Sequence, residues 1–233
     1  MVRKSLGLAL GLALAFAPVP QALAEQTLRL DGSVDSEVYS EVFLSANTYL
    51  IRDRDYDPAE PNRGLFTTWL YDPDARNLFQ LRARYCLPYP MSSAIESARL
   101  VGFDLMDGDQ VLLALERPLG AIPATPRTVR SGYYSPGQRY IDHVPVFTRF
   151  GVTYRTVWRE GPPVYHPPIA CLNGSAGFDL APISNDLVKL PERTLKVRLR
   201  FDNGETSGWQ LGGGTVRELK RLVAIRDSLA SNK

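Results

Sequence analysis

Residues 194–230 read TLKVRLRFDNGETSGWQLGGGTVRELKRLVAIRDSLA, and this stretch indicates the fold class of the whole chain. Apolar residues alternate with basic ones from Leu195 to Phe201, which is the period of a strand with one buried face. Asn203-Gly204 is a hairpin-turn signal. A short second strand, three glycines and an amphipathic segment follow. The stretch therefore predicts a β-hairpin that runs into a helix packed on the sheet.

The position of Trp209 conflicts with the simplest form of this hairpin. If Asn203-Gly204 forms a two-residue turn, Phe201 pairs with Thr206. Trp209 would then share a face with the arginines of the first strand. We expect a β-bulge at Ser207-Gly208, which would return Trp209 to the apolar face. The alternative is that Trp209 lies over an arginine on an exposed face.

The end of the same stretch predicts where the helix begins. Thr215 suits an N-cap, and Glu218 completes a capping box. The three glycines before it lie in no nucleotide-binding pattern, so we interpret them as a tight turn. Opposite the apolar face of the first strand runs a basic row, formed by Lys196, Arg198 and Arg200. The sequence leaves open whether this row meets an internal acidic segment or an outside partner.

Two further hairpins are expected upstream. Leu65–Leu70 and Leu78–Leu87 form one, and Ser97–Met106 and Gln110–Arg117 form another around Asp107-Gly108. We predict a mainly β (α+β) fold. It is an antiparallel β-sandwich or open barrel of roughly eight strands, with the C-terminal amphipathic helix packed on the sheet.

Three segments are less regular. Residues 36–50 have apolar positions at helical spacing, and we interpret them as a helix, although their β-branched and aromatic content also allows a strand. Residues 52–63 are predicted to be a polar loop. Residues 118–146 contain five prolines and little periodicity. Such a long irregular segment is usually functional or mobile.

The N-terminus predicts export. Arg3 and Lys4 precede an apolar run of 12 residues, Leu6 to Ala17, and Ala22-Leu23-Ala24 is a cleavage signal. The run is too short to span a membrane, which takes about 20 apolar residues. We expect a bacterial-type signal peptide at 1–24, cleaved after Ala24. A single exported domain, periplasmic or secreted, would follow at 25–233, with no transmembrane segment.

Composition narrows the partners. The chain has 27 basic and 25 acidic residues, and two of the basic ones lie in the predicted signal peptide. The expected mature chain is therefore neutral, which disfavours nucleic acid as a partner. The two cysteines, Cys86 and Cys171, are expected to form a disulfide in an exported protein. Two free buried thiols are the alternative.

The tyrosines of the irregular segment are the best binding candidates. Tyr133, Tyr134 and Tyr140 would contact an envelope component or polymer if they were exposed on a rigid scaffold. They would instead be part of a satellite core if they covered the sheet. Asp53, Asp55 and Asp57 resemble the start of a calcium loop, so Ca²⁺ is a possible ligand. The loop is not an EF-hand, because Pro58 and Gly64 replace its required glycine and glutamate.

Catalytic patterns are weak. A serine hydrolase would need His143 or His166, but the sequence around Ser175 lacks the first glycine of a nucleophile elbow. No catalytic residue is assigned. We therefore expect a non-enzymatic module that binds a ligand or an envelope partner. The alternatives are a hydrolase acting on an envelope or extracellular polymer and a structural or assembly component of the envelope.

Overall fold

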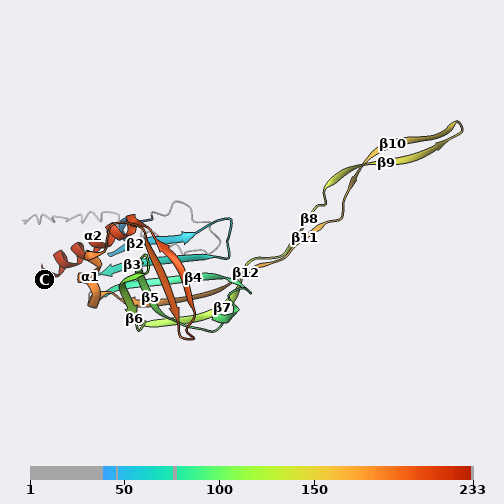
Figure 1. Ribbon diagram of the computed structural model, residues 1–233. Helices are drawn as coiled ribbons and strands as arrows, with labels where there is room; N and C mark the ends of the chain where they lie inside the picture. The colour runs from blue at the N-terminus through green and yellow to red at the C-terminus, as the bar shows by residue number, and fades with distance from the viewer. Residues whose placement is uncertain (1–38, 46, 76–77, 232–233) are drawn as a thin grey trace, which may run out of the picture.

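Two antiparallel sheets pack against each other, and a C-terminal helix lies beside them (Figure 1). The computed structural model describes residues 39–45, 47–75 and 78–231. The larger sheet has the strand order β1-β2-β3-β4-β12-β7, and the smaller one has the order β14-β13-β5-β6. The predicted β-sandwich with a helix on it is confirmed. The signal-peptide prediction falls on residues 1–24, which lie outside the described residues.

The larger sheet contains β1 (Val42–Ser45), β2 (Thr48–Tyr56), β3 (Gly64–Asp72), β4 (Leu78–Tyr89), β7 (Gly120–Arg130) and β12 (Ile169–Asp179). The smaller sheet contains β5 (Leu100–Asp107), β6 (Gln110–Glu116), β13 (Leu195–Phe201) and β14 (Thr206–Leu211). The helices are η1 (Ser93–Ile95), η2 (Ala181–Ile183), α1 (Ser184–Lys189) and α2 (Gly213–Ser231). Both predicted upstream hairpins are present, as β3–β4 and β5–β6.

Aromatic residues fill the space between the sheets. The ring of Trp69 in β3 meets Phe103 in β5 edge-on, with 6.0 Å between centroids. Tyr85 in β4 meets Phe201 in β13 in the same way, at 5.3 Å. These residues are buried because each occupies an inward position of a strand with period-two alternation. They hold the two sheets together as one core.

In the hairpin of β13 and β14, the change of register that places Trp209 on the apolar face occurs in the turn and not within a strand. Gly204 has a φ of 89°, and its N–H donates to the Phe201 carbonyl at 3.0 Å. Phe201 N–H in turn donates to the Glu205 carbonyl at 2.9 Å. This is a three-residue loop with a glycine bulge, so the register shifts by one. Trp209 therefore pairs with Val197 on the buried face, and the bulge predicted at Ser207-Gly208 is wrong.

An arginine does cover Trp209, but it does not belong to the hairpin. The guanidinium carbon of Arg63 lies 4.6 Å from the centroid of the Trp209 ring. Arg63 also donates to the Gly208 carbonyl at 3.3 Å. The indole is buried in the core and capped by a cation at the same time.

Helix α2 begins at Gly213, three residues earlier than a Thr215 N-cap predicts, and its cap comes from strand β2. Asp53 of β2 accepts a hydrogen bond from the Gly212 N–H at 2.9 Å. The Thr215 hydroxyl is buried and bonds to Ser40 at 2.9 Å, so the predicted Thr215–Glu218 capping box is wrong. A carboxylate at this end also suits the positive end of the helix dipole. The inward face of α2 is confirmed as apolar, with Val216, Leu219, Leu222 and Val223 buried.

The helix predicted over residues 36–50 is wrong where the structure describes it. Residues 42–45 and 48–56 form the β1–β2 hairpin, which turns at Asn47 with a φ of 70°. β2 also continues into the predicted polar loop as far as Tyr56. Its charges are accommodated because they find partners: the guanidinium of Arg54 lies 4.4 Å from the Tyr39 ring centroid.

The basic row of β13 is paired internally. Arg198 and Arg200 both donate to the carboxylate of Asp104 in β5, at 2.8 and 3.1 Å, and Asp104 is 1% exposed. Arg200 also reaches Glu116 at 3.1 Å. Burial lowers the pKa of Arg200, but the hydrogen bonds and charges of these two acids outweigh it and raise the pKa. Lys196 lies farther out, 4.0 Å from Asp109.

The predicted disulfide is present. Cys86 of β4 and Cys171 of β12 are bonded, with 5.4 Å between their Cα atoms. They lie on the outer face of the larger sheet with Phe66, away from the main core. The bond fits an exported protein. No helix in the described part of the chain is long and apolar enough to cross a membrane.

Candidate functional site: the extended arm

Residues 131–168 form a long two-stranded arm that leaves the sheets between β7 and β12 (Figure 1). The arm contains β8 (Tyr133–Ser135), β9 (Arg139–Thr148), β10 (Gly151–Glu160) and β11 (Val164–His166). The prediction that residues 118–146 are irregular is wrong, because β7, β8 and most of β9 occupy them. We call the remaining described residues the body. The strands of the arm pair with each other and not with the body.

Prolines and glycines divide the arm into two ribbons. The inner ribbon, nearer the body, is β8 paired with β11, and the outer ribbon is β9 paired with β10. Between the ribbons, Pro136-Gly137 faces residues 161–163, which contain two prolines. A proline has no N–H to give to the ladder, so regular pairing stops there. The two chains also come very close, because a side chain at Gly137 would meet the Gly161 carbonyl at 2.1 Å.

Every residue of the arm is exposed or half-buried. The candidate tyrosines therefore do not form a satellite core. Tyr134 is 71% exposed and lies 5.0 Å from the ring of Tyr165 across the inner ribbon. Tyr133 stacks on His166 with 4.6 Å between ring centroids. Tyr140 lies apart from them, near the start of β9 in the outer ribbon.

The outer ribbon has one strongly apolar face that the tyrosine prediction missed. Cross-strand pairing places Phe147 beside Val152, and Ile141 beside Trp158. Tyr154 lies between these two pairs on the same face. The alternation of the residues in β10 was a visible signal for this face. The sequence alone could not show that the body leaves it uncovered.

One serine and one histidine of the arm lie as close together as two members of a catalytic triad. His166 Nε2 lies 2.9 Å from the Ser135 hydroxyl. A triad also needs a carboxylate to orient the histidine and an oxyanion hole. The two carboxylates of the arm are engaged elsewhere: Asp142 pairs with Arg159 at 2.7 Å, and Glu160 pairs with Arg139 at 3.1 Å.

The other histidine and Ser175, the serine considered for a nucleophile elbow, are far apart in the topology. His143 lies in β9, where its Nδ1 is 3.4 Å from the Thr156 hydroxyl. Ser175 lies in β12, within the larger sheet of the body. The structure does not bring them together.

The candidate calcium loop is part of strand β2 and the turn after it. Besides Asp53, which caps α2, Asp55 accepts the N–H of Gln210 at 2.8 Å. Asp57 accepts the N–H of Ala59 at 2.9 Å. Each carboxylate thus serves a backbone N–H. Within the described ranges, no three His, Cys, Asp or Glu side chains are grouped as metal ligands would be.

Burial raises the pKa of Asp53, and hydrogen bonds from Gly212, Thr215 and Arg54 oppose that effect. The Asp53 carboxylate is therefore a buried helix cap whose charged form is disfavoured by burial. The structural role of Asp53 is thus to cap α2.

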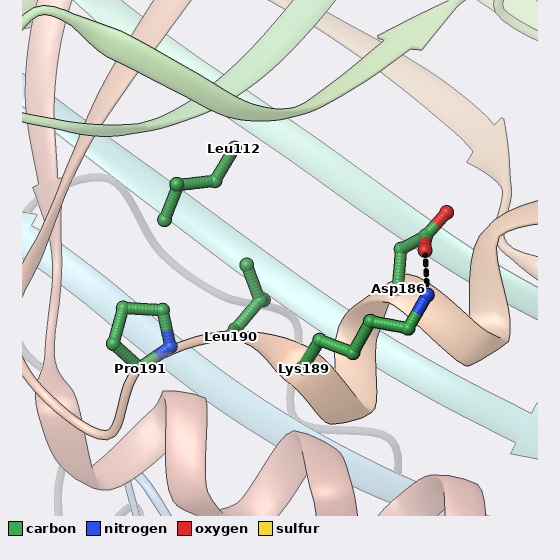
Figure 2. A pocket seen from close by; sticks show the side chains of 5 residues that line it. All are labelled: Leu112, Asp186, Lys189, Leu190 and Pro191. Carbon is green, nitrogen blue, oxygen red and sulfur yellow. Dashed lines mark hydrogen bonds and ion pairs between the residues drawn. The ribbon is translucent and has the colours of Figure 1, made fainter.

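One pocket in the described part of the body is small for a ligand. Figure 2 shows a pocket of about 150 Å³ between β6 and α1, lined by Leu112, Asp186, Lys189, Leu190 and Pro191. Ligand sites usually have about 300 Å³ or more. Across this pocket's rim, Lys189 and Asp186 already pair at 2.8 Å. The aromatic side chains of the arm are the stronger candidate.

No family model matches the chain, and no curated protein matches it in sequence.

Proposed function

We propose that this protein is an exported, non-enzymatic binding protein that holds a macromolecular partner of the cell envelope with its arm. The observation that carries the proposal is the arm itself, an extended ribbon with aromatic side chains exposed along it. Exposed aromatic residues supply large contact areas at low entropic cost, and they dominate binding energy at interfaces.

The distribution of these side chains favours a macromolecule over a small ligand. Tyr134 and Tyr165 lie on the inner ribbon, and Trp158 lies on the outer one. A ribbon strand of ten residues spans about 33 Å. Small-molecule sites are instead concave and bury most of the ligand. An extended row of contacts is what a polymer or a protein surface requires.

The disulfide supports two parts of the proposal, the export of the protein and the binding role of the arm. It links β4 to β12, the strand that leads out of the arm into the larger sheet. Cross-linking at that point stabilises the base from which the arm extends. Together with the signal-peptide pattern, it supports export to the periplasm or beyond, with cleavage after Ala24.

The test compares the mature chain with a variant in which residues 131–168 are replaced by Asn-Gly. Arg130 and Ile169 are cross-strand partners, so a two-residue turn can join them. We expect the mature chain to sediment with purified envelopes of the native organism. The arm-deleted variant should keep its melting temperature and lose this binding. Equal binding by the two proteins would overturn the proposal.

A finer variant changes Tyr133, Tyr134 and Tyr140 to alanine. It should weaken envelope binding with little change in melting temperature, because all three side chains are exposed. Leu119→Ser is the matched control, since it removes an exposed apolar side chain from the body. Envelope binding that survives the triple change would assign the contact to another part of the arm.

A further inference from the structure

We propose that the tip of the arm, residues 144–155, inserts into the surface of a negatively charged lipid layer. This inference deepens the proposed function, on which it rests, by naming the partner of one part of the arm.

The tip carries the most exposed large apolar side chains of the arm. Phe147 is 80% exposed and lies at the end of β9, and Phe150 is 87% exposed and lies in the turn between β9 and β10. Figure 1 places this turn at the far end of the arm, well away from the body. A flat surface could therefore meet the two rings before it met any other part of the molecule.

Both faces of the tip lack acidic groups. One face presents Pro145, Phe147, Val152 and Tyr154, and the other presents two valines, two threonines and Arg155. A protein partner or a second copy stacked on the ribbon would cover one face and leave the other in water. A lipid interface surrounds an inserted hairpin on all sides. Apolar side chains on both faces, with an arginine and no acidic group on the second face, thus favour an anionic lipid surface.

The charge of the tip is complementary to an anionic surface. Residues 143–159 include Arg149, Arg155 and Arg159 and no Asp or Glu. Arg159 is paired with Asp142, whereas Arg149 and Arg155 have no acidic partner among the described residues. The guanidinium of Arg149 lies 4.8 Å from the Phe150 ring centroid. Each basic residue near an anionic leaflet adds attraction that salt weakens.

The backbone limits the depth of insertion. β9 and β10 pair only with each other, so the outer edge of each strand presents unpaired N–H and C=O groups. Such groups are not tolerated in the hydrocarbon region. We therefore expect the phenylalanines to reach the boundary between headgroups and acyl chains, about 5–10 Å deep. Arg149 and Arg155 would remain among the phosphates.

The experiment is flotation of the mature chain with vesicles made of equal parts phosphatidylglycerol and phosphatidylcholine. We expect the chain to float with these vesicles and to bind vesicles of pure phosphatidylcholine much more weakly. Changing Phe147 and Phe150 to serine should weaken binding by about tenfold for each ring. Changing Arg149 and Arg155 to glutamine should weaken it by about fivefold for each charge.

The matched control is the double change Met91→Ser and Leu119→Ser. Met91 is 82% exposed, so this variant also loses two exposed apolar side chains, but from the body. It should bind the vesicles as the unchanged chain does. All variants should melt at the same temperature, because no residue of the arm is buried and because Met91 and Leu119 are exposed on the body.

Two results would overturn the inference. One is vesicle binding that the serine variant retains. The other is absence of binding to anionic vesicles. In that case, sedimentation velocity shows whether the chain forms dimers. Dimers that the serine changes dissociate would assign the tip to a second copy of the chain. Arm-dependent binding to native envelopes with no binding to pure vesicles would leave the proposed function in place and assign the tip to an envelope protein.

Discussion

The body and the arm are both antiparallel β-structure, but they treat their apolar residues in opposite ways. In the body, Trp69 and Phe103 are buried where two sheets meet. In the arm, Trp158 and Phe147 occupy equally regular strand positions and remain exposed. A two-stranded ribbon has no second layer to cover its faces, and alone it is only marginally stable. The body is therefore organised for stability, and the arm presents a surface.

A pair of tryptophans gives the largest contrast. Trp69→Ala should lower the free energy of unfolding by about 4 kcal/mol, because it leaves a large cavity in the core. Trp158→Ala should change it by less than about 0.5 kcal/mol, since that ring is 70% exposed. Urea unfolding followed by circular dichroism measures both. A large loss for Trp158 would show that the arm packs against something in the isolated protein.

The disulfide comes next. Replacing Cys86 and Cys171 by alanine should destabilise the body by about 2–4 kcal/mol, because the bond closes a long loop in the unfolded chain. The same change in the arm-deleted variant should cost nearly as much, since closure entropy depends only logarithmically on loop length. Urea midpoints of the four proteins test this. A cost that vanished without the arm would mean that the bond stabilises the arm and not the body.

The third contrast sets a buried carboxylate against an exposed one. Asp104→Asn should lower stability by about 2 kcal/mol, because Arg198 and Arg200 would lose the charge that both of them contact. That figure is below the value for a fully buried pair, since the arginines are partly in water. Asp142→Asn on the arm should cost less than about 0.5 kcal/mol. Equal costs in thermal melts would contradict the view that the ion pairs of the body are structural.

The smallest effect concerns Asp53. Because burial raises the pKa of Asp53, the folded chain binds the carboxyl proton of this residue more tightly than the unfolded chain does. Its contribution to stability is therefore greatest below its ordinary pKa and is lost as the pH rises through the raised pKa. Asp53→Asn keeps an acceptor for the Gly212 N–H and removes this loss.

The stability of Asp53→Asn relative to the unchanged chain should accordingly increase as the pH is raised from acid toward neutrality. Asp53→Ala removes the cap and should cost about 1 kcal/mol. Thermal melts across that pH range measure both variants. A relative stability of Asp53→Asn that fell with rising pH would show that hydrogen bonds outweigh burial at this carboxylate.

Much of the body could be predicted because its signals are local. Alternation in β4 and β13, the apolar run of β5 and the turn at Gly108 identified strands and hairpins before any contact was known. Residues 36–50 were misassigned because aromatic and β-branched residues fit both periods, and only pairing with β3 decides between them. The candidate tyrosines were found by composition, whereas the apolar tip was missed because exposure is not a property of the sequence.

The sequence by itself determined the β-rich class, the C-terminal helix and the pairing of its two cysteines. It did so through side-chain period, turn signals and a cysteine count, all of which act over a few residues or by elimination. Tertiary structure decided the register at Trp209, the internal use of Arg198 and Arg200, and the cap on α2 by Asp53. It also decided that the proline-rich segment is an arm. These features depend on residues far apart in the chain, whose meeting no local pattern records.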